Sequence, residues 1–266
     1  MANYNLILNL TYDCNMQCPF CYIRREKEKY KNIVLNPDNV VEIINKFDIR
    51  NITISGGEPT TLSYNILFTF LSKLREVWDG NIDFETNFTN PDVCYRLKDN
   101  FNINIVVGYD FNVRPMGQVI WNNLYESRKE FDLKLCVSPF LVKTYHPNLI
   151  IKKLSLLKNI KYVELVRYWK NENNQFKLDN QMFENYIERF VLTDFETNFN
   201  LLNKSKVLDG TFLFKNLYMQ PNGLLEYTNS GTIIEFVPFE DKVYNMDNDF
   251  LTYTNNLVKF MKEHND

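Results

Sequence analysis

The 266-residue chain is long enough for one large core with an appendage, and its 45% apolar and 15% aromatic residues suffice to bury that core. A net charge of −3 excludes the global basic field that draws proteins to nucleic acid or to an anionic membrane. The sequence shows no apolar N-terminal signal segment and no apolar run long enough to span a bilayer. We therefore expect a cytoplasmic protein that has neither a membrane nor nucleic acid as a partner.

Short apolar runs alternate with longer amphipathic segments, a pattern typical of βα units around a parallel sheet. Asn36 and Pro37 suit the cap and the first position of a helix. Six such units form either a doubly wound sheet or an incomplete barrel, and periodicity leaves both open. The pattern predicts strands near 5–11, 51–55, 81–86, 102–109, 132–139 and 161–167, and helices near 37–47, 61–77, 91–99, 115–129 and 147–158.

The regular alternation ends after the sixth predicted strand. Residues 169–181 are polar and indicate a loop or linker. We expect a core domain at 1–170 and a smaller C-terminal extension at 171–266 that covers the core. Within the extension the pattern predicts a helix near 181–192, an irregular segment with Gly210 and Gly223, and an amphipathic tail near 247–264.

Three of the five cysteines, Cys14, Cys18 and Cys21, lie within eight residues directly after the first predicted strand. A disulfide is the weakest explanation for a chain expected in a reducing compartment. A structural zinc site normally has four ligands, and no second Cys-x-x-Cys pair exists here. An iron–sulfur cluster uses cysteine thiolates at short spacings, and three of them would leave one iron open to another ligand.

Polar motifs follow the other predicted strands at the point where each strand ends. Since active-site groups of α/β proteins collect at the carboxyl ends of parallel strands, we expect these groups to meet at one rim. They are Ser55-Gly56-Gly57-Glu58-Pro59 after the second strand, Thr86-Asn87 at the third, Asp110 and Arg114 after the fourth, and Ser138 at the fifth.

The Cys14-x-x-x-Cys18-x-x-Cys21 spacing, with Phe20 before the last cysteine, resembles the cluster motif of the radical S-adenosylmethionine (SAM) enzymes. Gly56-Gly57-Glu58-Pro59 resembles the motif that holds the amino group of SAM in that family. The resemblance covers about residues 5–167. It implies a partial (β/α)6 TIM-like barrel with a smaller C-terminal extension, one [4Fe–4S] cluster on the three cysteines, and SAM bound at the open iron.

The resemblance also assigns roles to single residues. Phe20 would lie beside adenine, although core packing explains it equally well, and Arg114 would bind the SAM carboxylate, a surface salt bridge being the alternative. Thr86-Asn87 resembles a Thr-Asn-Gly strand end in which Phe88 replaces the glycine. Gly108 stands where a ribose-binding serine is often found. The implied cofactor-binding residues are Phe20, Gly56, Gly57, Glu58, Pro59, Asn87, Asp110, Arg114 and Ser138.

By resemblance, the reduced cluster passes an electron to SAM, and the resulting 5′-deoxyadenosyl radical takes a hydrogen atom from the substrate. An external electron donor of the flavodoxin or ferredoxin type is implied. Residues 207–210 and 218–224 resemble the extension of peptide-modifying relatives, but no cysteine follows Cys136, so an auxiliary cluster of that kind is not expected. The expected substrate is a peptide or a peptide-derived natural product.

Two other functions remain open from the sequence. The first is a single-cluster small-molecule or nucleotide enzyme with a viperin-like layout. The absent auxiliary cluster favours it, and so does the basic run at 24–31, unless that run is merely a solvated helix face. The second is a redox-sensing iron–sulfur or zinc protein without enzymatic activity, which leaves Gly56-Gly57-Glu58-Pro59 unexplained.

Cys136 shares a strand face with Ser138, because side chains alternate along a strand. If Ser138 points toward SAM, Cys136 points into the barrel. A free cysteine usually packs as a small hydrophobe. The alternative is a catalytic thiol that returns a hydrogen atom to the substrate radical, as in some radical SAM peptide epimerases. Cys94 is the poorer candidate, because it lies in a predicted helix outside the barrel.

Overall fold

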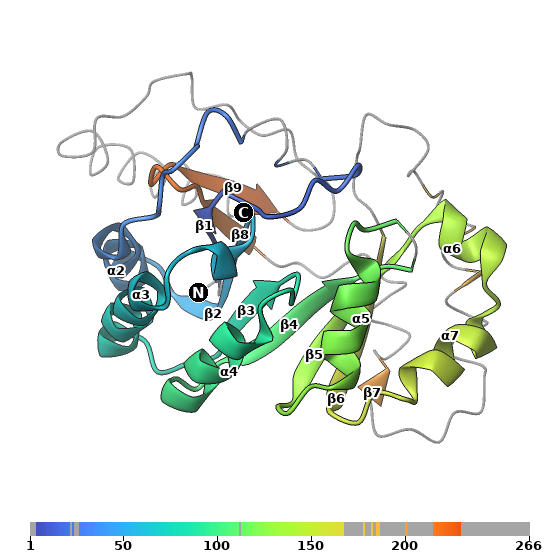
Figure 1. Cartoon of the computed structure of the whole chain (residues 1–266). Coiled ribbons are helices and arrows are strands. Elements are labelled where there is room, and N and C mark those ends of the chain that lie inside the picture. Colours follow the sequence, from blue (N-terminus) through green and yellow to red (C-terminus); the bar gives the residue numbers. More distant parts are fainter. Residues whose placement is uncertain are drawn as a thin grey trace.

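A parallel sheet built from six strands in chain order forms the centre of the molecule (Figure 1). The computed structural model describes residues 4–21, 23, 27–111, 113–167, 178, 182, 185–186, 200–201 and 215–229. The strands are β1 (Tyr4–Thr11), β2 (Ile49–Gly56), β3 (Ile82–Thr86), β4 (Asn104–Tyr109), β5 (Phe131–Val137) and β6 (Ile160–Arg167), and each pairs in parallel with the next. The sheet order, β7-β6-β5-β4-β3-β2-β1-β8-β9, is linear, so the barrel is open.

Helices connect consecutive strands, as the periodicity predicts. They are α2 (Pro37–Lys46), α3 (Tyr64–Val77), α4 (Pro91–Asn100), α5 (Gly117–Tyr125), α6 (Pro139–Thr144) and α7 (Pro147–Leu154), with a short 3-10 turn η1 (Pro59–Thr61). The cap at α2 is confirmed, because the Asn36 side chain accepts a 3.0 Å hydrogen bond from the backbone N–H of Asp38. No helix of the described segments is long and apolar enough to cross a membrane.

The partial barrel and all six predicted strands are confirmed, with one correction at the fifth. That strand ends at Val137 and not at residue 139, because Ser138 caps α6 and Pro139 occupies its first position. The helix predicted near 115–129 is shorter, and it begins at Gly117 after Met116, which has a left-handed φ of 58°. The run from 27 to 32 forms turns, so its described part is not the helix face that the sequence suggested.

The two faces of the sheet differ in character. Residues such as Leu8, Ile54, Phe84, Val107 and Leu135 are fully buried and form one core with the inner sides of the helices. The residues that alternate with them are mostly polar. One face of each strand therefore builds the helix-covered core, and the other face is available to line the inside of the open barrel.

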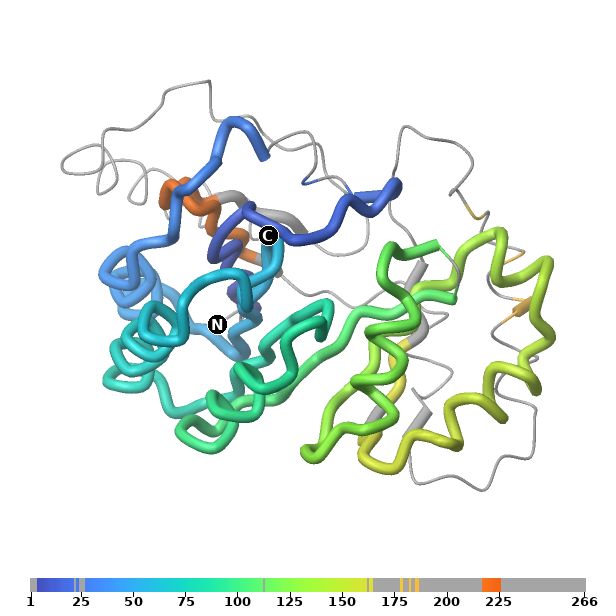
Figure 2. Tube along the Cα trace, viewed as in Figure 1, coloured from blue at the N-terminus to red at the C-terminus, as the bar shows by residue number. Residues whose placement is uncertain are grey.

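Strands from the part of the chain after residue 171 lengthen the sheet at both edges. The hairpin of β8 (Lys215–Met219) and β9 (Leu225–Asn229) pairs in parallel with β1, while β7 (Asn200–Leu201) pairs with β6. Figure 2 shows the hairpin beside the N-terminal strand, although the two are far apart in sequence. Most of the helix expected near 181–192, the segment 207–210 and the tail near 247–264 lie outside the described residues. That the extension covers the barrel stays a prediction.

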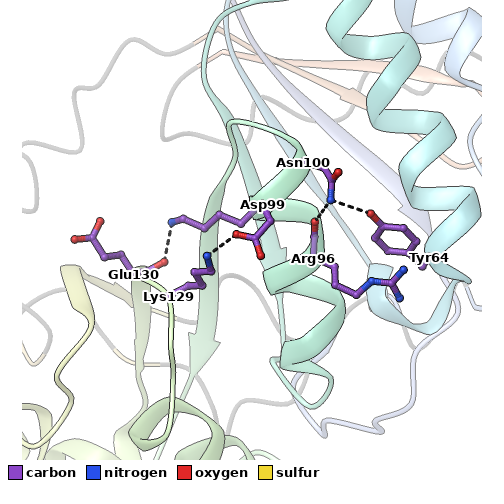
Figure 3. A network of polar contacts seen from close by, with 7 residues as sticks. Tyr64, Arg96, Asp99, Asn100, Lys129 and Glu130 are labelled. Carbon is purple, nitrogen blue, oxygen red and sulfur yellow. Dashed lines mark hydrogen bonds and ion pairs between the residues drawn. The ribbon is translucent and has the colours of Figure 1, made fainter.

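A polar network on the helical side joins α3, α4 and the segment before β5 (Figure 3). Asn100 donates a 3.2 Å hydrogen bond to the Tyr64 hydroxyl, and the Arg96 guanidinium lies 3.7 Å from the centre of the Tyr64 ring. Lys129 forms an ion pair with Asp99. These exposed contacts hold the helices in position at a distance from the carboxyl ends of the strands, where the site lies.

Candidate active site

The three clustered cysteines lie in the loop after β1, around one cavity. Cys14, Cys18 and Cys21 are free thiols, and all three line a cavity of about 320 Å³ together with Gly57 and Lys27. The backbone N–H of Cys21 donates to the Cys18 carbonyl at 3.1 Å, and the N–H of Met16 donates to Cys14 Sγ at 3.4 Å. The sequence-predicted ligands therefore share a single space.

The cavity has the donor set of a three-cysteine iron–sulfur site. No three His, Cys, Asp or Glu side chains of the described residues converge on one point as metal ligands, so cluster binding would draw the three thiols inward. Burial raises the pKa of Cys14, and it raises that of Cys18 to about 12. Both are thiols at neutral pH without metal, and iron would bind their thiolates by displacing the protons.

The glycine pair after β2 packs directly against the cysteine loop. The Gly57 N–H donates to the Thr11 carbonyl at 2.6 Å, and the Glu58 N–H donates to the Asp13 carbonyl at 2.8 Å. A Cβ atom at Gly57 would lie 2.2 Å from the Asp13 oxygen, and one at Gly56, where φ is +116°, would lie 2.4 Å from the Thr11 oxygen. Only glycine allows this approach, which couples the two predicted motifs.

The Glu58 carboxylate is buried and engaged by the protein itself. One oxygen accepts hydrogen bonds from the Thr60 N–H (3.1 Å), the Thr60 hydroxyl (2.6 Å) and the Thr86 hydroxyl (2.8 Å), and the other accepts from the Asn87 N–H (2.6 Å). Burial raises the pKa of Glu58, and these four donors oppose that effect. The geometry favours a positioning role, in which Glu58 fixes the loop that begins at Gly57 and continues into Pro59.

Asn87 joins the end of β3 to the cysteine loop. Its side-chain N–H donates to Asn15 at 2.8 Å, and its side-chain oxygen accepts from the N–H and hydroxyl of Thr89. Phe88, which replaces the glycine of the Thr-Asn-Gly pattern, has a left-handed φ of 60°. This backbone conformation favours glycine, and the Phe88 ring is fully buried with its centre 6.0 Å from that of the Tyr95 ring.

Arg114 lies inside the site in a buried ion pair. Its Nε lies 3.1 Å from Asp110 Oδ2, the two side chains are 13% and 1% exposed, and Asp110 also accepts from the Arg114 backbone N–H at 2.7 Å. The guanidinium lies 5.5 Å from the centre of the Phe20 ring. A Cβ at Gly108 would come within 3.3 Å of the guanidinium, so the absent serine makes room for Arg114. The salt bridge named as the alternative is therefore present, but it is buried and not at the surface, and the role of Arg114 toward the SAM carboxylate stays a prediction.

Ser138 and Cys136 differ in their surroundings. The Ser138 hydroxyl oxygen caps α6 by accepting from the Leu141 N–H at 3.1 Å, so it is already engaged by the protein. Cys136 is half-buried, and it is absent from the hydrophobic core formed by the described residues. Burial raises the pKa of the Cys136 thiol to about 11, partly opposed by Arg114. Cys94, by contrast, is completely buried in α4, as expected.

Gln220, from the β8–β9 hairpin, contacts the lining of the cysteine cavity, and the sequence interpretation missed it. Its side-chain oxygen accepts a 3.0 Å hydrogen bond from Asn9 on β1 and a second hydrogen bond from the hydroxyl of Tyr12, which lines the cysteine cavity. The motif-like stretch 218–224 was the available signal. Lys27 of the basic run also reaches the site, where it donates to the Cys14 carbonyl at 3.2 Å.

Comparisons with known proteins agree with this geometry. Residues 8–116 match the model of the radical SAM superfamily. A 98-residue stretch is 30% identical to a probable GTP 3′,8-cyclase of Saccharolobus islandicus, covering 35% of this chain and 30% of that protein. An uncharacterized protein of Methanocaldococcus jannaschii is 23% identical over 248 residues, which cover 89% of this chain and 82% of that protein.

Solved structures share the fold at low sequence identity. Streptococcus suis SuiB bound to the precursor peptide SuiA matches with a TM-score of 0.60 and 14% identity, over 84% of this chain and 59% of SuiB. The enzyme anSMEcpe with bound AdoMet and a peptide matches with a TM-score of 0.56 and 14% identity, over 71% of this chain and 59% of that one. The cysteine loop, the glycine pair and the family match together lead to one conclusion: residues 8–116 of this chain form a radical SAM domain.

Proposed function

We propose that this protein cleaves SAM reductively at a single [4Fe–4S] cluster and abstracts a hydrogen atom from a peptide or peptide-derived substrate. The observation that carries the proposal is the direct contact of the two motifs. The N–H groups of Gly57 and Glu58 donate to carbonyls of the cysteine strand and loop, and Gly57 lines the same cavity as Cys14, Cys18 and Cys21. A cluster and a ligand at the glycine pair would therefore be neighbours.

The chain's own groups would bind and orient the cofactors. Cys14, Cys18 and Cys21 would hold three irons of the cluster, which together with SAM supplies the electron transfer and the 5′-deoxyadenosyl radical. Arg114, already aligned by Asp110, would donate hydrogen bonds from its guanidinium group to the SAM carboxylate. Phe20, next to Arg114, offers an aromatic face for adenine. Backbone carbonyls that Glu58 holds in place would receive the ammonium group.

The peptide substrate is supported by the likeness to SuiB and anSMEcpe, whose structures hold peptides, and by the hairpin that continues the sheet beside β1. The chain spans about 30% of the length of the GTP cyclases that it matches and 59% of SuiB, so these proteins suggest candidates only. A small-molecule or nucleotide substrate is the second candidate. It is favoured by Lys27, which brings a positive charge to the cavity.

Anaerobic reconstitution with iron and sulfide tests the proposal. We expect about four irons per chain, because three local thiolates suffice to anchor a cubane. Replacing Cys14, Cys18 and Cys21 by Ala should abolish iron binding, whereas replacing Cys94 or Cys136 should not. With dithionite or reduced flavodoxin as electron donor, the intact protein should convert SAM to methionine and 5′-deoxyadenosine in equal amounts. A zinc ion on the same cysteines, with no iron or sulfide retained, would contradict it.

A further inference from the structure

The sheet face opposite the helices carries charged and amide side chains. On β3 and β5, the buried residues alternate with the half-buried Asp83, Glu85, Asp132 and Lys134, and β6 adds the half-buried Glu164. Strands covered on both faces are near-continuously apolar, and barrel interiors are commonly filled by branched apolar side chains. This chain departs from that rule across neighbouring strands, which indicates a space for a polar ligand and not a packed core.

Lys134 and Glu85 form an ion pair across β4. The Lys134 ammonium donates to one oxygen of Glu85, and the Ser55 hydroxyl donates to the other at 2.6 Å. The register partner of Lys134 on the intervening strand β4 is Gly108, which has no side chain of its own. The two side chains keep 34% and 26% of their surface exposed although they lie on central strands, so the face opens onto a space. The positive charge of Lys134 is neutralised within the chain.

Two carboxylates on the same face lack comparable partners. Glu164 is the register partner of Lys134 on the neighbouring strand, about 4.8 Å away. Among the described residues, Glu164 makes no hydrogen bond, and the buried Oδ1 atom of Asp132 has no partner. Burial raises the pKa of both groups. Asp83, by contrast, accepts hydrogen bonds of 3.1 Å from Asn51 and Asn104.

Charge on this face therefore favours a cation. Within the described part of the chain, Asp83 and Glu85 accept hydrogen bonds from protein donors. Asp132 is influenced by the positive charges of Lys161 and Lys98, whereas Glu164 is influenced only by Lys134, which is already paired with Glu85. A ligand that brings N–H donors and a positive charge would supply what Glu164 lacks. An anionic ligand would find Lys134 already paired with Glu85 and would meet three further carboxylates.

We propose that this face is the substrate-binding face and that Glu164, beside the Lys134–Glu85 pair, binds an ammonium or guanidinium group of the substrate. A lysine or arginine side chain of a peptide has this chemistry. Lys134 lies two residues before Cys136 on the same strand face, about 7 Å toward the amino end. The cationic group would thus be held beneath the SAM site, with the rest of the substrate extending toward Arg114 and Cys136. This assignment rests on the proposed function and narrows its substrate class.

Binding of small probes to the SAM-loaded, unreduced holoprotein tests the assignment without turnover. The probes are N-acetyl-lysine N-methylamide, N-acetyl-arginine N-methylamide, the neutral N-acetyl-norleucine N-methylamide and the anionic N-acetyl-glutamate N-methylamide, followed by ligand-observed NMR. We expect the cationic probes to bind at least tenfold more tightly than norleucine, and glutamate to bind no better than norleucine. Equal binding of all four probes would overturn the assignment.

Two variants distinguish a binding site from a purely structural ion pair. Glu164→Gln keeps the shape of the side chain and should remove the tenfold preference, whereas Glu42→Gln, in an ion pair with Lys46 on α2, should keep it. Lys134→Met should strengthen cation binding severalfold, because Glu85 then becomes available. If the Lys134–Glu85 pair is purely structural, Lys134→Met should be less stable and Glu164→Gln should bind the cationic probes as the wild type does. Unchanged probe binding in Glu164→Gln would by itself refute the proposal.

The proposed SAM cleavage and the assignment of a cationic substrate group can be refuted independently of each other. Probe binding needs no electron transfer, and 5′-deoxyadenosine formation by the wild-type protein needs no probe. If SAM is not cleaved but the cationic preference depends on Glu164, the substrate assignment stands and the proposed reaction is wrong. If SAM is cleaved without any cationic preference, the reaction stands and the assignment is wrong.

Discussion

The carboxylate of Glu58 accepts a 2.6 Å hydrogen bond from the backbone N–H of Asn87, 29 residues further along the chain. This contact connects the loop after β2 to the end of β3. Since Asn87 also donates to Asn15, the cysteine loop belongs to the same network. Three segments that would surround the cofactors are thus held in place before any cofactor binds.

Glu58→Ala tests this positioning role. The substitution would leave the N–H groups of Thr60 and Asn87 and two hydroxyl groups without their acceptor, and hydrogen bonds to a charged group contribute about 1.5–3 kcal/mol each. Removing the buried carboxylate also removes its desolvation cost, which offsets much of this loss. We expect the free energy of unfolding of the cofactor-free protein to fall by about 3 kcal/mol in urea titrations, and SAM affinity to fall with it. Glu42→Gln is the surface control. Lost SAM affinity at unchanged stability would instead make Glu58 a direct ligand of the ammonium group.

Phe88→Gly separates backbone strain from packing. Glycine would relieve a left-handed conformation that costs about 1–2 kcal/mol, but it would also remove a fully buried ring, which costs about 3–5 kcal/mol. We therefore expect a net loss of about 2–3 kcal/mol in the free energy of unfolding. Phe88→Ala, which keeps the strain, should lose more. A variant Phe88→Gly as stable as the wild type would show that the ring contributes little.

Gly108→Ser examines the space that Arg114 occupies. The new Cβ would lie 3.3 Å from one guanidinium nitrogen and 3.4 Å from the other, so the guanidinium has to shift slightly relative to Asp110 and Phe20, and the added hydroxyl takes up further space beside it. We expect SAM affinity to fall about tenfold, which is about 1.4 kcal/mol. Gly117→Ala is the matched control, because a Cβ there meets nothing within 4 Å. Equal SAM affinity in both variants would exclude Arg114 from the cofactor site.

Local pattern predicted most of the elements, because helix caps and strand alternation are properties of short segments. Asn36 with Pro37 marks the start of α2 correctly, and the strict alternation in 131–137 marks β5. The same alternation also held the signal for the polar face, since Asp132 and Lys134 stand between buried residues of a parallel strand. The sequence interpretation used this alternation only to place Cys136 and did not recognise the polar face.

Long-range pairing was outside the reach of local pattern. Gln220 reaches Asn9 across 211 residues because β8 pairs with β1, and no periodicity within either strand encodes that partnership. The short helix α6 was missed for a different reason. Six residues do not cover two helical turns, so the cap at Ser138 and the proline at 139 were its only signals, and both lie where the strand was expected to continue.

Stability should depend on pH through Glu164. Burial and the like charges of Glu85 and Asp83 raise the pKa of Glu164 above its ordinary value of 4.5, against the opposing effect of Lys134. The folded protein then binds the Glu164 proton more tightly than the unfolded chain does. The resulting contribution to the free energy of unfolding is fully present below pH 4.5 and is lost as the pH rises through the pKa of Glu164 in the folded protein. Relative to Glu164→Gln, we expect the wild-type free energy of unfolding to decrease as the pH rises above 4.5. If the free energy of unfolding differed between the wild type and Glu164→Gln by the same amount at every pH from 4 to 8, the raised pKa of Glu164 would be contradicted.

Cys136→Ser decides between a packing cysteine and a hydrogen-atom donor. The thiol keeps its hydrogen at neutral pH because burial raises its pKa to about 11, and it lies on the polar strand face with Lys134. If it donates that hydrogen atom, the serine variant should still form 5′-deoxyadenosine but yield little inverted product, because an O–H bond is not a comparable donor. If it only packs, the variant should lose about 1–3 kcal/mol of stability with an unchanged ratio of product to SAM consumed.

Cys94→Ser is the control, because Cys94 lies fully buried in α4 and its replacement should alter stability alone. The half-buried position of Cys136 outside the described core favours the first outcome, and an unchanged product ratio would refute it.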